Sequence, residues 1–183
     1  LPNSASVIKS ELVGALDSNI AGIDVDSSCL SFVSAFEMAS GLLNGVQYKR
    51  LVIVSSEISS IGANPANWET FTLLGDAAVA VIVEYDESSG SQFIKGGQRT
   101  YSEGVYETII KGGGNKYFFK EHPYQPDLHS FSMNGIKVLR IASKRIPEFM
   151  EWFFSDLPFK IEEMDAVIPH QASRTGINLF KRM

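Results

Sequence analysis

Apolar residues recur at the three- and four-residue spacing of an amphipathic helix in three stretches of the chain. The helices that this spacing predicts cover residues 5–16, 30–44 and 136–154. Gly45 follows the second stretch, at the point where such a helix would end. Pro147 lies inside the third stretch, and we expect it to kink or divide that helix.

Short apolar runs between these stretches predict strands. The expected strands cover 20–26, 51–54, 79–84 and 166–168, with one more near 108–111. The run 51–54 is of the kind that a parallel sheet buries on both faces. Strands that alternate with helices predict an α/β fold with a largely parallel sheet.

Composition narrows the possible classes of protein. The chain has 183 residues, and its 44% hydrophobic content is enough for a proper core. Lys and Arg number 16 against 21 Asp and Glu, and the resulting net charge of −5 argues against general nucleic-acid binding. No apolar run approaches the roughly 20 residues that span a bilayer, and no signal peptide is visible. A single cysteine suits a reducing compartment, so we expect a cytoplasmic protein.

Both ends of the sequence differ from those of a typical complete domain. The chain begins with Leu1-Pro2, and the helical pattern at 176–183 carries no stop signal. We therefore expect this sequence to be an internal piece of a longer protein.

The single cysteine, Cys29, stands where the predicted strand 20–26 passes into the predicted helix 30–44. Backbone N–H groups at a helix start are unpaired and carry the positive end of the helix dipole, which favours the thiolate that attacks carbonyl carbons. Ser27 and Ser28 precede it and allow a sharp turn. A lone cysteine can also be a small buried hydrophobic residue, so both interpretations stay open.

A nucleophilic cysteine usually has a histidine nearby, and the chain offers three. His122 and His129 lie in an irregular, Pro- and Gly-containing region and are expected at the surface. His170 follows the predicted strand 166–168 at its C-terminal end, where open parallel sheets place ligands, although it can equally be a core or helix-capping histidine. Cys29 and His170 thus hold equivalent positions, which suggests two similar α/β units across one site.

Other motifs carry less information. The glycine runs 96–97 and 112–114 fit neither the dinucleotide fingerprint nor the phosphate-binding loop, so they predict flexible loops. One cysteine and no closely spaced histidine pair give no metal-ligand pattern, and we expect no metal site.

Three motifs together resemble a known family. They are DVDSSCLSF at 24–32, GDAAVA at 75–80 and VIPHQAS at 167–173. With their order and spacing, the sequence resembles the thiolase-fold condensing enzymes, and within them the 3-oxoacyl-acyl-carrier-protein synthase III group, along essentially the whole chain.

The resemblance implies a thiolase-like αβαβα layered fold made of two related halves, and a homodimer. Residues 1–98 would be the remainder of the N-terminal half with the nucleophilic cysteine, and 99–183 the start of the C-terminal half with the catalytic histidine. The fold would be incomplete, lacking N-terminal strands and a C-terminal part. The family's third catalytic residue, an asparagine, would lie beyond Met183, so the 183-residue piece alone is expected to be inactive.

The chemistry that the resemblance implies is acyl transfer. Cys29 would take an acyl group from acyl-CoA or a similar thioester, and a malonyl thioester on acyl carrier protein would then lose CO2. His170 would stabilise the enolate that attacks the acyl group. CoA and phosphopantetheine thioesters would be substrates, and no metal or redox cofactor would be needed.

The resemblance also implies binding residues. Substrate contacts fall on Gly135, Ala172 and Trp68, and Trp68 stands where well-studied members carry an arginine that contacts the CoA adenine. Because acyl carrier proteins are acidic, an acidic enzyme needs a local basic patch. The candidates for carrier-protein docking are Arg140, Lys144 and Arg174, whose alternative role is that of solvated helix charges.

Other functions remain open at this point. The same fold could serve a hydroxymethylglutaryl-CoA synthase or an acyltransferase that forms esters or amides. A non-catalytic partner of a condensing heterodimer is a further alternative. The pathway, fatty acid or polyketide biosynthesis, also stays open.

Overall fold

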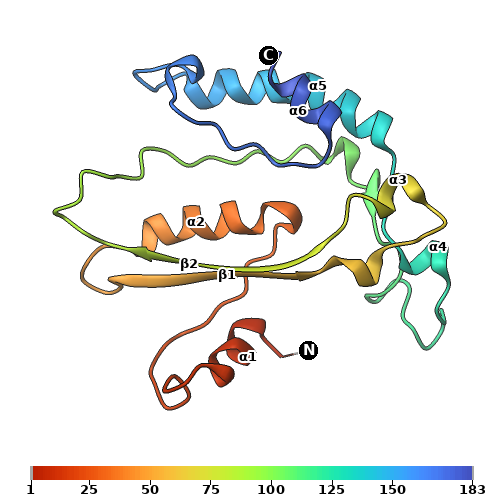
Figure 1. Cartoon of the computed structure of the whole chain (residues 1–183), viewed down its shortest axis with the longest axis horizontal. Coiled ribbons are helices and arrows are strands. Elements are labelled where there is room, and N and C mark those ends of the chain that lie inside the picture. The colour runs from red at the N-terminus through yellow and green to blue at the C-terminus, as the bar shows by residue number, and fades with distance from the viewer. Residues whose placement is uncertain (1, 183) are drawn as a thin grey trace. The chain divides into compact units, whose positions relative to one another are not determined.

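The computed structural model describes residues 2–182 (Figure 1). The chain divides into two compact units, one formed by Leu1–Ser56 with Ala78–Gly96 and the other by Glu57–Ala77 with Gly97–Met183. The first unit carries Cys29 and the second carries His170. The two units differ from the predicted division after residue 98 mainly in that 57–77 joins the second unit, and the assignment of halves stays a prediction.

The first helix, α1 (Ser4–Glu11), is shorter than the periodicity at 5–16 predicted. Asn3 caps it by accepting a hydrogen bond from the amide of Ser6. The Asp24 carboxylate accepts from the amides of Ser4 at 2.7 Å and of Ala5 at 2.9 Å. These backbone bonds, that of Ser4 first, lower the pKa of Asp24, because they favour its charged form.

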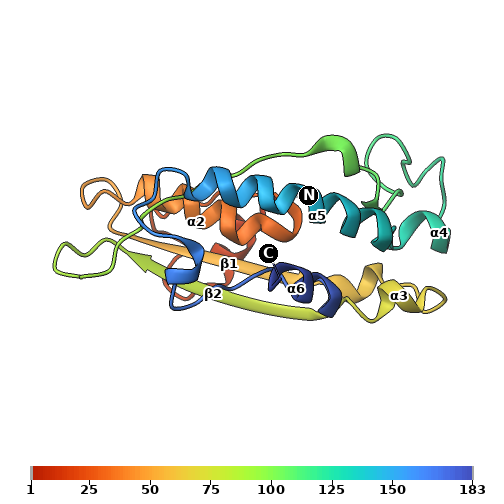
Figure 2. The ribbon, with the colours of Figure 1, turned by 90° about the horizontal axis from the view of Figure 1, so that it is seen from above.

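Helix α2 (Ser31–Leu42) confirms the helix predicted at 30–44. On this helix Ala39 is 3% exposed. The ring centroids of Phe36, also on α2, and of Phe93 lie 5.9 Å apart. Figure 1 shows α2 along one face of the strands β1 and β2, and Figure 2 shows the same arrangement from above.

Gly45 follows α2 with a φ of 73°, in the left-handed region that favours glycine. A Cβ at this position would lie 2.6 Å from the ring of Tyr85. We expect Gly45→Ala to lower the free energy of unfolding of the full-length protein by about 2–3 kcal/mol, from backbone strain and overpacking together.

The matched control is Gly41→Ala inside α2, where, apart from its chain neighbours and the backbone of the helix itself, no atom of the described residues lies within 4 Å of the new methyl group. It should leave stability unchanged or raise it by up to about 1 kcal/mol, because alanine favours helix. Urea denaturation of both variants measures the difference. Equal unfolding midpoints for the two variants would contradict the role given to Gly45.

Strands β1 (Arg50–Ile58) and β2 (Asp76–Glu84) confirm the strands predicted at 51–54 and 79–84. They form a two-stranded sheet. Tyr85, directly after β2, donates its amide to the carbonyl of Lys49, directly before β1, at 2.8 Å, so the strands run antiparallel (Figure 1). The expectation of a largely parallel sheet is therefore wrong for these strands. A parallel pair needs a long crossover, usually a helix, and only short helical turns lie between β1 and β2.

Burial alternates along β1. Leu51 and Ile53 are half-buried, whereas Val52 is 59% exposed and Val54 is exposed as well. On β2, Ile82 is exposed too. The expectation that β1 is buried on both faces is thus wrong within the described residues, because only one of its faces is covered.

The second unit holds short elements and one long helix. They are η2 (Ser59–Gly62), α3 (Trp68–Phe71), η3 (Ser102–Gly104), β3 (Thr108–Ile109), α4 (Pro126–His129), β4 (Ser132–Met133), α5 (Gly135–Phe154), η4 (Ile161–Glu163) and α6 (Arg174–Phe180). Helix α5 confirms the helix predicted at 136–154, and Pro147 lies inside it without dividing it. Strand β3, predicted near 108–111, pairs antiparallel with β4, with Thr108 opposite Met133.

Two predicted strands are wrong. Residues 20–26 and 166–168 have no strand structure, and Ile168 is 90% exposed. A strand forms only when its backbone pairs with a neighbour, and the described residues give these two segments no pairing strand.

The described part of the chain buries little apolar surface. Its buried apolar side chains are Ala15 and Ala39 alone. The proper core expected from composition is therefore not formed by these residues alone, because their apolar faces point outward. Among residues 2–182 no helix is both long and apolar enough to cross a membrane.

Candidate active site

Cys29 lies in a one-turn helix, η1 (Ser28–Leu30), that leads directly into α2. Its thiol is free and exposed. Ser28 has a φ of 51°, which is uncommon for a residue other than glycine. Such strained backbone is typical of functional sites and persists only where its surroundings hold it.

Serine side chains hold this turn in place. The Ser31 hydroxyl accepts from the amide of Ser27 at 3.0 Å and donates to the carbonyl of Ser28 at 2.7 Å. The Asp26 carboxylate accepts from the amide of Ser28 at 3.0 Å. These local bonds offset the cost of the left-handed turn, and they leave the thiol of Cys29 open to a substrate.

The alternative that Cys29 is a small buried residue is wrong, because its side chain is exposed. The regular helix begins at Ser31, one residue later than the predicted start at residue 30. The catalytic role of Cys29 stays a prediction.

His170 lies in an irregular segment that leads into α6, and its side chain is exposed. The N-cap of α6 is Ser173, whose hydroxyl accepts from the amide of Gly176 at 3.0 Å. The alternatives of a core or capping histidine for His170 are therefore wrong. Ala172 is exposed directly before this cap. Cys29 and His170 each stand at the end of an irregular segment that opens a helix, one in each unit.

His129 departs from the prediction that it lies at the surface. Its ring stacks on Phe119, with centroids 4.8 Å apart, and on Tyr124 at 5.6 Å. Its Nδ1 lies 3.1 Å from the amide nitrogen of Gln125. Its Nε2 is buried and has no partner among the described residues. The aromatic residues at 117–124 could have signalled this packing.

Two expected substrate-binding residues, Trp68 and Gly135, lie on neighbouring segments of the second unit. Trp68 is 71% exposed and stacks on Phe71, with centroids 5.9 Å apart. The next residue, Glu69, has a carboxylate oxygen 3.7 Å from the place where a Cβ on Gly135 would lie. The helix that carries Trp68 therefore lies beside Gly135, the first residue of α5.

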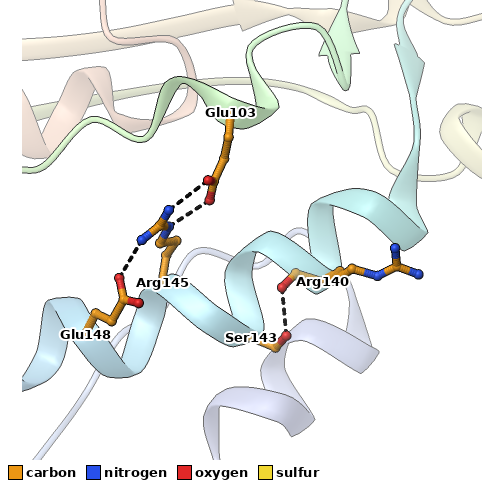
Figure 3. A network of polar contacts seen from close by, with 5 residues as sticks. All are labelled: Glu103, Arg140, Ser143, Arg145 and Glu148. Atoms are coloured by element: carbon orange, nitrogen blue, oxygen red, sulfur yellow. Dashed lines mark hydrogen bonds and ion pairs between the residues drawn. The ribbon is translucent and has the colours of Figure 1, made fainter.

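The expected docking residues lie on two helices that pack together, α5 and α6. Arg140 and Lys144 are exposed on α5, and Arg174 is exposed at the start of α6. Figure 3 shows the Arg140 side chain directed away from the ion pairs of Arg145.

Arg145 itself is engaged in ion pairs. It donates to both carboxylate oxygens of Glu103 at 2.7 Å and to Glu148 at 2.8 Å (Figure 3). The bonds to Glu103, then to Glu148, raise the pKa of Arg145. Sequence reasoning missed the pair with Glu103, because 42 residues separate the partners. Within residues 2–182, no group of three or more His, Cys, Asp or Glu is arranged to hold a metal ion.

Solved structures define the fold. A 2.1 Å crystal structure of a 3-oxoacyl-(acyl-carrier-protein) synthase III matches with a TM-score of 0.81 and 21% identity, covering 100% of this chain and 56% of that one. A priming β-ketosynthase from a polyketide biosynthetic pathway matches with a TM-score of 0.78 and 20% identity, covering 100% of this chain and 52% of that one. The fold is thus the α/β, thiolase-like layered fold, present in incomplete form.

The sequence matches agree with this fold. A family model described as 3-oxoacyl-[acyl-carrier-protein (ACP)] synthase III matches residues 23–102, which contain Cys29. A β-ketoacyl-[acyl-carrier-protein] synthase III of Syntrophomonas wolfei is 26% identical over 183 residues, covering 100% of this chain and 54% of the relative. The resemblance seen in the sequence is confirmed, because this chain is similar in sequence to synthase III enzymes. It spans about half the length of the curated relatives it matches.

Proposed function

We propose that the protein carrying this chain is a β-ketoacyl-acyl-carrier-protein synthase III-like acyltransferase. It loads an acyl group on Cys29 and then condenses it with a malonyl thioester. The observation that carries this proposal is the exposed thiol in a left-handed turn ahead of α2, inside the segment that matches the synthase III family.

The first step is thioester exchange. The Cys29 thiolate attacks the carbonyl carbon of the acyl thioester, the tetrahedral oxyanion collapses, and the carrier leaves as a thiolate that takes up a proton. The backbone N–H of Cys29 donates a hydrogen bond to that oxyanion in this proposal. One thioester replaces another, so the acyl-enzyme is close in free energy to the substrate.

The second step is decarboxylative condensation. The malonyl carboxylate leaves as CO2, and its bonding electrons form an enolate. An N–H of His170 donates a hydrogen bond to the enolate oxygen, on which negative charge develops in this step. The enolate carbon then attacks the acyl carbonyl, and the Cys29 thiolate is released. These steps balance without a metal or a redox cofactor.

The partners follow from the same proposal. Acyl-CoA or another acyl thioester supplies the primer, and malonyl-acyl carrier protein supplies the extender. Trp68, Gly135 and Ala172 contact the substrate arm, while Arg140, Lys144 and Arg174 attract the acidic carrier protein. The protein would act as a cytoplasmic homodimer in fatty acid or polyketide biosynthesis.

Mass spectrometry of the full-length protein tests the proposal. Incubation with short and medium acyl-CoA should add one acyl mass to the peptide that contains Cys29. Malonyl-acyl carrier protein should then release one CO2 for each 3-ketoacyl product. Acyl loading without CO2 release would indicate a hydroxymethylglutaryl-CoA synthase or an ester- or amide-forming acyltransferase. An enzyme that takes no acyl group from any of these thioesters would contradict the proposal and favour a non-catalytic partner.

A further inference from the structure

Asp76, the first residue of β2, makes two hydrogen bonds to one residue of another element. Its Oδ2 accepts from the hydroxyl of Ser60 at 2.6 Å, and its Oδ1 accepts from the Ser60 amide at 2.8 Å. The bond from the hydroxyl, then that from the amide, lowers the pKa of Asp76. The carboxylate thereby fastens the one-turn helix η2 to the start of β2.

The same turn holds a distant segment. The carbonyl of Gly62, the last residue of η2, accepts from the amide of Phe131 at 2.8 Å. A Cβ on Gly62 would lie 3.2 Å from Ile110, so side-chain packing also restricts this end of the turn. Movement of η2 would therefore be transmitted to Phe131.

Phe131 stands directly before β4 and the turn that opens α5. On its other side, the hydroxyl of Thr70 lies 3.5 Å from the Phe131 carbonyl, and Thr70 is only 1% exposed. The backbone N–H of Asn134 donates to the carbonyl of Glu107 at 2.8 Å. The Asn134 side chain caps α5, because its Oδ1 accepts from the backbone N–H of Lys137 at 3.2 Å. The backbone from Phe131 to Gly135 is therefore fixed by contacts with three separate segments.

We propose that Asp76 is a positioning residue for the turn Met133–Gly135. It fixes η2, η2 holds Phe131, and Phe131 sets the register of β4 and the start of α5, beside the helix that carries Trp68. That this turn receives the substrate arm rests on the proposed function. The arrangement gives the Gly-Asp-Ala-Ala motif a physical role, because the two carboxylate oxygens of Asp76 each accept one of the Ser60 bonds.

Hydrogen exchange on the full-length protein tests this chain of contacts without using activity. In Asp76→Asn the side-chain amide replaces one of the two acceptors, so the charge and one bond from Ser60 are lost. We expect the rate of amide hydrogen exchange across residues 131–137 to rise roughly tenfold, because the variant loses about one charge-assisted hydrogen bond.

The matched control is Asp86→Asn. Asp86 also binds the hydroxyl and the amide of one serine, Ser88, at 2.7 and 2.9 Å, but through its Oδ1 alone, in the turn after β2. Asparagine at this position removes the carboxylate charge and keeps an oxygen for both bonds, so it controls for the loss of charge. This variant should leave exchange at 131–137 unchanged. Wild-type exchange at 131–137 in Asp76→Asn, or equal acceleration by the control, would overturn the proposal.

Kinetics then separate positioning from general stability. Asp76→Asn should raise KM for acyl-CoA and for malonyl-acyl carrier protein alike, roughly tenfold, while the acylation rate of Cys29 at saturating acyl-CoA stays unchanged. A wild-type protein without acyl loading would refute the proposed function, whereas the exchange result would still judge the role of Asp76. If Asp76→Asn fails to fold, Ser60→Ala serves instead, because it removes the hydroxyl bond and keeps the amide bond. Unchanged exchange at 131–137 in Ser60→Ala would likewise overturn the proposal.

Discussion

Cys29→Ala is expected to abolish acyl-enzyme formation in the full-length protein and to lower the condensation rate by roughly 10⁴-fold or more. The sequence has one cysteine, so no second thiol in this chain can hold the acyl group. Intact mass spectrometry after incubation with acyl-CoA measures the loading, and release of CO2 together with 3-ketoacyl product measures the condensation.

The control for this variant changes the same turn without removing the thiol. Ser28→Gly replaces the residue at φ 51° with one that adopts this backbone freely, so loading of Cys29 should persist. Acyl loading of Cys29→Ala at the wild-type level would place the nucleophile elsewhere and refute the proposed function.

His170→Ala is expected to separate the two half-reactions. Loading of Cys29 should persist, whereas condensation should fall roughly 10²–10³-fold, the usual loss when one donor to a developing oxyanion is removed. Single-turnover acylation and the release of CO2 from malonyl-acyl carrier protein measure the two steps separately.

Two further variants test whether the His170 N–H group is what matters. His170→Gln keeps an N–H donor and should retain more condensation than His170→Ala. His122→Ala removes a histidine whose ring packs against the edge of Tyr117 in the irregular region. Both steps should stay within about twofold of wild type. Equal loss of acylation and condensation in His170→Ala would show that the histidine acts on the cysteine and not on the enolate.

The helices and the strands differ in how well the sequence predicted them. Helices α2 and α5 follow from apolar spacing because their hydrogen bonds lie within the segment, so a local pattern is enough. The strands predicted at 20–26 and 166–168 failed for the opposite reason. A strand depends on a neighbour that the local sequence does not specify, and those segments have no pairing strand among the described residues.

The direction of strand pairing shows the same limit. The apolar run of β1 is compatible with either a parallel or an antiparallel sheet, and an alternation of strands and helices favoured the parallel one. The observed pair is antiparallel, because the segment that joins β1 to β2 contains only short helical turns. Such a segment turns the chain back, so that β2 pairs with β1 in the opposite direction.

The sequence by itself determined the places of Cys29 and His170, each ahead of a helix, because turn residues and helix caps act over a few neighbouring residues. Only the tertiary structure decided that Asp76 holds Ser60, that Gly62 holds Phe131 and that Glu103 holds Arg145. It also decided which apolar faces are left uncovered. The physical reason is distance along the chain. A long-range hydrogen bond or a packed face needs a partner that folding brings close. The residues next to either partner in the sequence do not identify the other.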